Sequence, residues 1–232
     1  MKERPILFSA PMVRALLDGS KTQTRRIVKK AHDNVAKDTA WAVCPAAESG
    51  WIAWFGEQRT DIAAFTKKAY AHGFPCPYGQ PGDRLRVKEN AWMWCEIKQD
   101  GLTKTGKIKI RYEPMRKAPI HYHADHPHKP LTTIVSPDGK WGWRMKVGRF
   151  LPSWASRITL EIVNVRVERL QDISADDAKA EGVYPTKTGL YAAGQFIDEY
   201  RLLWESINGP GSWDANPWVW VIEFKQVDHA AA

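Results

Sequence analysis

The sequence predicts an α+β fold built around a small β-barrel, with flanking helices and two insertions. Segments with the apolar pattern of β-strands are the most frequent, and three stretches have helical periodicity. Strands and helices do not alternate as they would in a parallel βαβ sheet. The 232 residues, 44% of them hydrophobic, are enough for one domain to bury a full core without disulfide bonds.

The N-terminal segment predicts a strand, a helix and a second strand. The first strand is RPILFS, and the helix covers residues 10–18, with Ser9 as its cap and Gly19 at its end. Residues 20–28, SKTQTRRIV, are expected to be β because Thr and Val suit a pleated surface and no helical stripe continues.

The middle of the chain predicts one clear strand between two less regular stretches. Residues 31–78 include a hairpin-like tract, WAVCP and WIAWFG, for which no firm structure is predicted. The turn-rich CPYGQPGD leads into a strand in which Leu85 and Val87 alternate with basic residues. Residues 96–150 are expected to form an irregular insertion with one short strand, IKIRY, and a polar run, HYHADHPHKP.

A long strand is predicted at residues 157–169, RITLEIVNVRVER. Its apolar residues occupy even-numbered positions up to Ile162 and odd-numbered positions from Val163 onward. A β-bulge near Ile162 would explain this change of phase.

Two helices and a closing strand complete the predicted fold. Ser174 and Asp177 are a capping pair for a short helix that stops at Gly182. The segment GQFIDEYRLLWESING then places its apolar residues on one helical face. The last segment, WVWVIEFK, is almost continuously apolar, which is typical of a strand covered on both faces.

The charge of the chain favours a polyanionic partner. Lys and Arg exceed Asp and Glu by 34 to 26, and the pI is about 9.4. Residues 1–30 hold eight basic and two acidic residues, so much of the excess is concentrated there. The alternative is a dispersed charge that serves only solubility.

Cysteine usage and hydropathy predict a cytoplasmic protein without a membrane segment. Cys44, Cys76 and Cys95 form no CxxC pair and are odd in number, which fits a reducing compartment. The N-terminus lacks the apolar run of a signal peptide, and no stretch of about 20 apolar residues occurs.

Three segments resemble the ASCH domain family of the PUA-like superfamily. GSKTQTRR, from Gly19 to Arg26, resembles the GxKxxExR signature, with Thr24 where many members have Glu. PGDRLRV resembles the family's GD.L.V strand, and WVWVIEFK resembles its terminal strand. The resemblance implies a PUA-like barrel within a single ASCH-like domain, residues 1–232. Its core segments are residues 4–30, 79–95 and 150–226, and its insertions are residues 31–78 and 96–149.

The Thr24 form of the signature is similar to that of the bacterial N(4)-acetylcytidine amidohydrolases. This similarity implies that Lys21, Thr24 and a glutamate are catalytic, and the matching glutamate in DAKAEGV is Glu181. The longer runs SWASRITLEIVNVRVERLQDIS and SINGPGSWDANPWVWVIEFK resemble ASCH proteins of tailed phages and prophages. That larger branch implies no particular activity.

In amide hydrolysis each of these side chains would have a separate catalytic role. A partly desolvated Lys21 would take the Thr24 hydroxyl proton, and Glu181 would orient or protonate the leaving amine. Arg26 would hold phosphate or oxyanion charge. Residues three apart on an ideal strand point to opposite faces, so Lys21 and Thr24 meet only if the chain bends between them. The alternative is an exposed basic rim beside an ordinary strand.

The remaining candidate site residues are basic, acidic and aromatic. Those expected to bind RNA or a nucleoside are Arg25, Arg26, Arg86, Glu89, Trp92 and Trp154. The two tryptophans are the best stacking candidates, and a stacked base contributes about 1–3 kcal/mol. No cofactor or metal is expected. The histidines of residues 121–128 match no closed zinc spacing, so a solvated, mobile loop is favoured over a metal site.

RNA or a nucleoside is therefore the expected partner, and two classes of function remain open. One is an enzyme, foremost an amidohydrolase of N(4)-acylated cytidine and otherwise a ribonuclease of the same superfamily. The other is a non-catalytic reader that uses the same basic pocket and aromatic stacking. A factor acting on a host protein is a third alternative, suggested only by the insertions.

Overall fold

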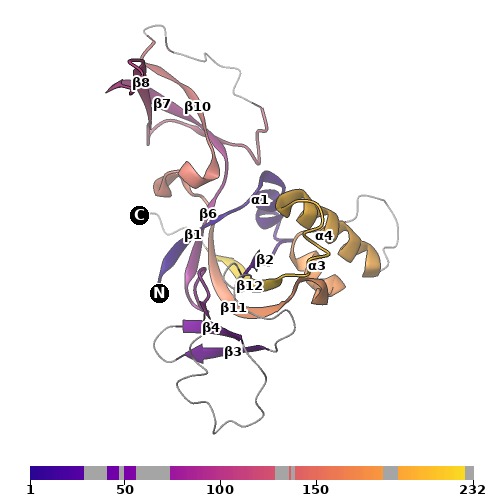
Figure 1. Ribbon diagram of the computed structural model, residues 1–232. Coiled ribbons are helices and arrows are strands. Elements are labelled where there is room, and N and C mark those ends of the chain that lie inside the picture. The colour runs from indigo at the N-terminus through magenta and orange to yellow at the C-terminus, as the bar shows by residue number, and fades with distance from the viewer. Residues whose placement is uncertain are drawn as a thin grey trace. The chain divides into compact units, whose positions relative to one another are not determined.

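The structure is a computed structural model, in which the chain has the predicted α+β composition, with many strands and few helices (Figure 1). It describes residues 1–28, 41–46, 50–55, 74–128, 136, 139–184 and 193–227. The chain forms two compact units. The first comprises residues 1–4, 15–85 and 160–227, and the second comprises mainly residues 5–14 and 86–159.

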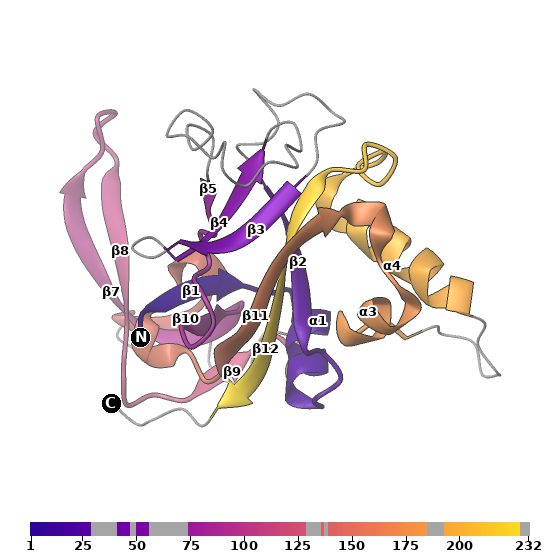
Figure 2. The same ribbon diagram turned by 90° about the horizontal axis from the view of Figure 1, so that it is seen from below.

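A five-stranded sheet contains the strands predicted from both ends of the chain. Its order is β1 (Glu3–Leu7), β6 (Arg84–Lys88), β11 (Thr159–Arg169), β12 (Trp218–Val227) and β2 (Gln23–Ile27). β1 and β6 contribute residues to both units. Figure 2 shows β2, β11 and β12 side by side. β12 is buried on both faces from Val219 to Ile222, as its continuous apolar run predicted.

The burial of β11 changes phase later than predicted. Leu160, Ile162 and Val165 are buried, whereas Val163 is 52% exposed. The backbone N–H of Val165 donates to Oδ1 of Asn164 at 2.9 Å, a local bond of the kind that competes with regular strand pairing. The change therefore lies between Ile162 and Val165, and Val163, the first apolar residue of the second phase, faces outward.

The helices are α1 (Ala10–Leu17), α3 (Ala175–Ala180) and α4 (Ala193–Asn208). α3 has the predicted capping box, and a 3₁₀ turn, Leu170–Asp172, precedes it. α4 packs its buried aromatic face against a core that includes Val219 and Val221 of β12. α3 and α4 also contact each other (Figure 1), so together they cover one part of the first unit.

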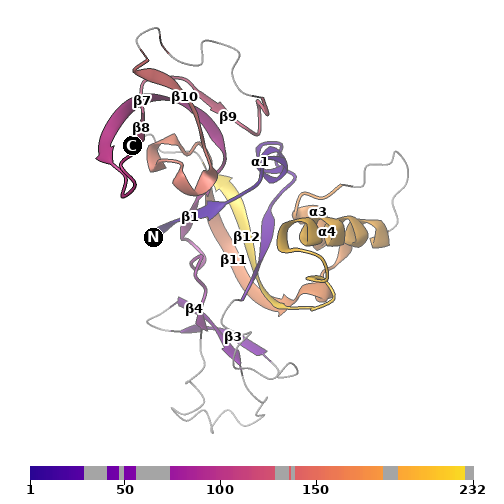
Figure 3. The same cartoon turned by 45° about the horizontal axis from the view of Figure 1, so that its top comes forward.

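The second unit contains an antiparallel sheet where an irregular insertion was predicted. β7 (Ala91–Leu102) pairs with β8 (Ile108–Pro114), β9 (Ile120–Tyr122) and β10 (Trp141–Lys146). Figure 3 shows these strands, and two 3₁₀ turns, Gly148–Phe150 and Ser153–Ala155, follow β10. The short strand predicted at IKIRY is confirmed as β8, and the rest of the sheet was missed because residues 96–102 of β7 are mostly polar and show no apolar alternation.

The first insertion contributes three short strands to the first unit. β3 (Trp41–Ala46), β4 (Gly50–Phe55) and β5 (Phe74–Pro75) form an antiparallel sheet, in agreement with the hairpin-like tract. The rest of the predicted insertion at residues 31–78 lies largely outside the described residues.

None of the sheets formed by the described residues closes on itself, so the small barrel stays a prediction. Among the helices in the described part of the chain, none has the length and apolar character needed to cross a membrane.

The late phase change in β11 can be tested with two matched substitutions. Val165→Ala should lower the free energy of unfolding by about 2 kcal/mol, because it removes buried methyl groups and leaves a cavity. Val163→Ala, two residues away on the same strand, should change it by less than about 0.5 kcal/mol. Urea denaturation of both variants measures the difference, and equal losses would contradict the observed phase.

Candidate functional site

The backbone of Lys21 is held between the ends of two helices. Its N–H donates to the carbonyl of Ala15 in α1 at 2.8 Å, and the N–H of Thr22 donates to the carbonyl of Ala180 in α3 at 2.8 Å. Lys21 and Glu181 form an isolated antiparallel bridge. Segments 160 residues apart in the sequence are thus brought into direct contact.

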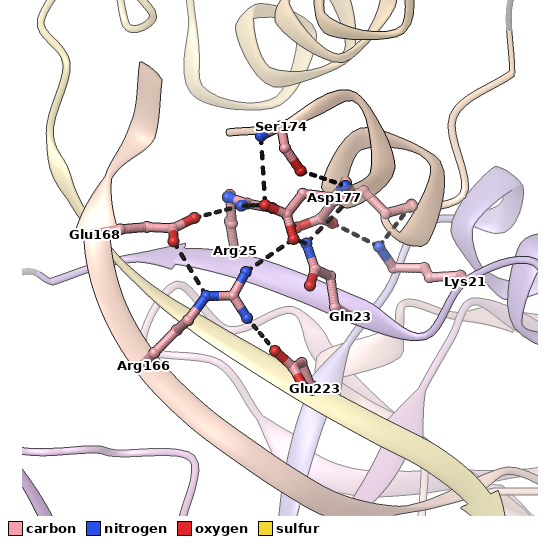
Figure 4. Close-up of polar contacts among 9 residues, drawn as sticks. Lys21, Gln23, Arg25, Arg166, Glu168, Ser174, Asp177 and Glu223 are labelled. Atoms are coloured by element: carbon pink, nitrogen blue, oxygen red, sulfur yellow. Dashed lines mark hydrogen bonds and ion pairs between the residues drawn. The ribbon is translucent and has the colours of Figure 1, made fainter. Parts of the chain in front are cut away.

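The side chains of Lys21 and Glu181 form a fully buried ion pair (Figure 4). Nζ of Lys21 donates to Oε2 of Glu181 at 2.7 Å and to its backbone carbonyl at 2.8 Å. The two side chains are 0% and 2% exposed. Burial lowers the pKa of Lys21 below its ordinary value, although the Glu181 carboxylate opposes this change. Deprotonation of Lys21 therefore costs less free energy than deprotonation of an exposed lysine.

Gly182 permits this close approach. Its φ is +80°, in the left-handed region, and it follows Glu181 directly. A Cβ at this position would lie 2.7 Å from Cβ of Ala15 and 3.1 Å from Cβ of Lys21. Glycine thus meets both the backbone and the packing requirement where α3 ends.

Arg25 extends the ion pair into a network of carboxylates. Its guanidinium side chain is 0% exposed and contacts Glu168 of β11 as well as Asp177 of α3 at 3.1 Å. A third contact, of 3.5 Å, joins Nη1 of Arg25 to Oε1 of Glu181. Arg25 thereby links the strand β2 to β11 and to the α3 helix.

A second arginine continues the network from β11. Arg166 contacts Glu168 at 3.1 Å, Asp177 at 2.8 Å and Glu223 of β12 (Figure 4). Nε2 of Gln23 donates to Oδ1 of Asp177 at 3.0 Å. Burial opposes ionisation of Asp177, but the charge of Arg25 and the bond from Gln23 lower its pKa to about 2.

The network pairs three cations with four anions. Its cations are Lys21, Arg25 and Arg166, and its anions are Glu168, Asp177, Glu181 and Glu223. Each buried charge has an opposite charge within hydrogen-bonding distance, which is the condition for tolerating charges away from water. Among the predicted catalytic residues, the structure therefore brings Lys21 and Glu181 together.

Thr24 occupies the other face of β2. It is buried and lies opposite Ile222 of β12. Gln23 and Arg25, its neighbours in the strand, both contact Asp177 of α3, so strand alternation directs Thr24 away from that helix. The side chain of Lys21 also lies toward α3, on the same side of the chain as the side chains of Gln23 and Arg25. The bend expected between Lys21 and Thr24 does not bring Lys21 to the Thr24 face.

The expected binding residues are divided between the two units. Arg25 and Arg26 belong to the first unit, where Arg26 is half-buried opposite Trp220. Those in the second unit are Arg86, Glu89, Trp92 and Trp154. Their role in binding stays a prediction. For Arg25, the three carboxylates around its guanidinium favour a positioning role.

Glu89 is part of a separate charge cluster in the second unit. Nε of Arg157 donates to Oε1 of Glu89 at 2.9 Å, and Nη1 donates to Oδ2 of Asp125 at 2.6 Å. The guanidinium lies 4.0 Å from the ring centre of Tyr122. Burial raises the pKa of Glu89, although Arg157 acts in the opposite direction.

Part of the His-rich run lies in a strand, and part contacts this cluster. Its His121 lies in β9, and its ring packs edge-on against Trp143 at 4.8 Å. Asp125 is held by Arg157. Residues 121–124 are half-buried or buried, so the prediction of a solvated loop is wrong for them, whereas residues 125–128 are exposed as predicted. Across the part of the chain that the structure describes, no group of three or more His, Cys, Asp or Glu residues is placed to hold a metal ion.

Several network residues were missed in the sequence, although a signal was present. Arg166 and Glu168 are charged residues at alternate positions of a strand whose other alternate positions are valines, and Glu223 interrupts the apolar run of β12. Charges at a spacing of two in such strands indicate a paired network. Their partners across the fold cannot be assigned from spacing alone.

Removing one partner of the buried ion pair should be costly. Lys21→Met leaves the Glu181 carboxylate without its closest cation and should lower the free energy of unfolding by about 3–5 kcal/mol. Adding Glu181→Gln should recover part of this loss, because the uncompensated charge is removed. The control is Lys225→Met, whose side chain is 61% exposed and which should cost at most about 1 kcal/mol. A Lys21→Met loss no larger than that of the control in urea denaturation would contradict the role of the pair.

The network should also give the protein a defined sensitivity to acid. The folded-state pKa of Asp177, about 2, lies below its ordinary value of 3.8, so the carboxylate stabilises the fold above pH 4. Because the side chain is 22% exposed and solvent screens its contacts, this contribution is at most about 2 kcal/mol, and it is lost as the pH falls from 4 towards 2. Asp177→Asn should destabilise the protein at pH 6 and flatten the loss of stability below pH 4. Asp176→Asn, at a side chain that is 90% exposed, should leave that slope unchanged in urea titrations at each pH.

Comparison of this chain with protein-family models, with curated proteins and with solved structures finds no match.

Proposed function

We propose that this chain is an ASCH-type protein of the PUA-like class that binds RNA or a modified nucleoside. The observation that carries the proposal is the contact between Lys21 and Glu181. These residues were selected in the sequence as matching signature positions, and they lie 2.7 Å apart in the structure although they are 160 residues apart in the chain. Chance selection of two residues in a chain of 232 would rarely give such a pair.

The surroundings of β2 support binding through its basic residues. The carboxylate network occupies the α3 side of the strand and compensates Arg25. Arg26 lies at an alternate position, on the face shared with Thr24, and is only half-buried. A guanidinium suits phosphate because it donates a planar pair of hydrogen bonds. In this proposal Arg26 contacts phosphate, and the network fixes the strand that carries it.

Hydrolysis of N(4)-acylated cytidine is the second candidate, favoured by the lowered pKa of Lys21 beside a carboxylate. The reaction starts once the shared proton has moved from Nζ of Lys21 to Glu181, which leaves a neutral amine beside a carboxylic acid. Oγ of Thr24 then bonds to the acyl carbon, its proton passes to Lys21, Glu181 gives its proton to N4, and the bond from carbon to N4 breaks. Water then cleaves the Thr24 ester to release the carboxylic acid. Binding ranks first because Thr24 faces away from the Lys21 side of β2 and the mechanism requires a rearrangement.

One experiment separates the two functions. The purified protein is incubated with N(4)-acetylcytidine and its longer acyl analogues, and cytidine release is followed by chromatography. Binding of each nucleoside is measured in parallel by calorimetry. The variants are Thr24→Val, which keeps the shape of the side chain, Glu181→Gln and Arg26→Gln, with Lys225→Gln as an exposed control. Urea midpoints identify any variant that has lost its fold.

The expected result is nucleoside or RNA binding that Arg26→Gln weakens and Lys225→Gln preserves. Cytidine release that Thr24→Val and Glu181→Gln abolish, with binding retained, would establish the hydrolase. Binding that persists in Thr24→Val without any release would establish a reader. A folded protein that binds neither RNA nor nucleosides would refute the proposed function.

A further inference from the structure

The strand register of the second unit gathers four tryptophans on one face of its sheet. Trp94 of β7 lies opposite Trp143 of β10, and Glu96 lies opposite Trp141. Trp92 lies opposite Met145 on one side and His121 of β9 on the other. Cross-strand partners share a face, and residues two apart on a strand share it as well. The four indole rings therefore belong to one face.

The opposite face of this sheet is the one that packs on a core. Met93 and Cys95 of β7 are 1% and 0% exposed and contact Leu151 and Ala155. An antiparallel sheet with one face on a core normally carries polar residues on the other face. Tryptophans at those positions are therefore unusual, and aromatic surfaces of this kind are typical of binding sites.

The rings of the tryptophan face pack against one another and remain partly exposed. Trp143 is 6% exposed and forms its base, with the rings of Trp94 and His121 packed edge-on against it at 5.5 Å and 4.8 Å. Trp92, Trp94 and Trp141 keep part of their surface exposed. Edge-on packing orients the rings without covering all of their faces, so flat ligands can stack on them.

A basic ribbon continues from the same face. Beyond Ile97, β7 and β8 form a two-stranded hairpin, and residues 99–111 are exposed throughout. Residues 98–111 hold five basic residues and one acidic residue. The basic residues are Lys98, Lys104, Lys107, Lys109 and Arg111.

The pairing also fixes where these charges lie. Lys98 lies opposite Arg111, so both share the tryptophan face, and Lys109 follows at the alternate position. Their contacts with Glu96, Glu113 and Asp100 join side chains that are 37% to 60% exposed. Exposed ion pairs contribute little, so a phosphate can replace these carboxylates at small cost.

We propose that this face of the β7–β10 sheet, with the ribbon of residues 98–111, is a second binding surface that takes single-stranded RNA. Stacking on aromatic rings combined with a cationic track along the backbone is how unpaired strands are bound. A duplex would not fit the tryptophans, because its bases are already stacked on one another. The inference goes beyond the proposed function, and its residues belong to a different unit from Lys21 and Glu181.

The test measures binding of a labelled single-stranded RNA of about twelve nucleotides to the full chain by fluorescence anisotropy. Trp94→Leu keeps apolar volume but removes the ring, and it should weaken binding about tenfold. Trp218→Leu is the matched control, at a half-buried tryptophan of the first unit whose ring is covered by Arg169 at 4.2 Å. It should leave the affinity unchanged.

The ribbon is tested through the salt dependence of the same binding. Lys104→Gln with Lys107→Gln should reduce the slope of log affinity against log salt by about 0.7 for each phosphate that the protein no longer neutralises. The control, Lys179→Gln with Lys225→Gln, removes the same charge from exposed positions of the first unit and should leave the slope unchanged. Urea midpoints confirm that each variant is folded.

Three outcomes would overturn the inference: equal losses in the test and control variants, tighter binding of duplex RNA or of single-stranded DNA, or no binding of the single strand. Nucleoside binding lost on Arg26→Gln but kept by Trp94→Leu would leave the proposed function standing in each of these cases. Conversely, loss of RNA binding in Trp94→Leu without any effect of Arg26→Gln would support this surface while the proposed function fails.

Discussion

The buried ion pair between Lys21 and Glu181 is the constraint on which the first unit depends. A lysine and a glutamate can remain away from water only if the geometry keeps them in contact, and here the backbone bonds on both sides of Lys21 provide it. Arg25 and Arg166 extend the same requirement to β11, α3 and β12. Each charge needs an opposite charge beside it, and the observed arrangement of these elements provides one for every charge of the network.

Much of this unit could be predicted because its local signals agree. The cap at Ser174, the stop at Gly182 and the apolar run of β12 each specify one element without knowledge of the rest. Lys21 and Glu181 were also identified, but through a resemblance to a family motif. Their direct contact, and the carboxylates around Arg25, could not be derived because pairing between distant segments leaves no periodicity in the sequence.

The second unit was predicted poorly for a different physical reason. Strand recognition relies on a polar face that alternates with an apolar one, and β7 lacks this alternation: its first residues are apolar on both faces, and residues 96–102 are mostly polar. The tryptophans at the start of β7, which stand where polar residues are expected, also make that face of the sheet unusual. In β11, the alternation was visible, but burial resumes at Val165 rather than at Val163, next to the bond that the N–H of Val165 donates to Oδ1 of Asn164.

The order of the five-stranded sheet has a consequence for how the chain is made. β2, near the N-terminus, has β12 as its neighbour, and β12 pairs with it through residues such as Ile222, about two hundred positions later. During synthesis β2 therefore stays without its strand partner until β12 has been made. Pairing of β12 with β2 then adds β2, with Thr24 and Arg25, to the sheet. A chain truncated before Trp218 would leave a charged strand with no sheet to join.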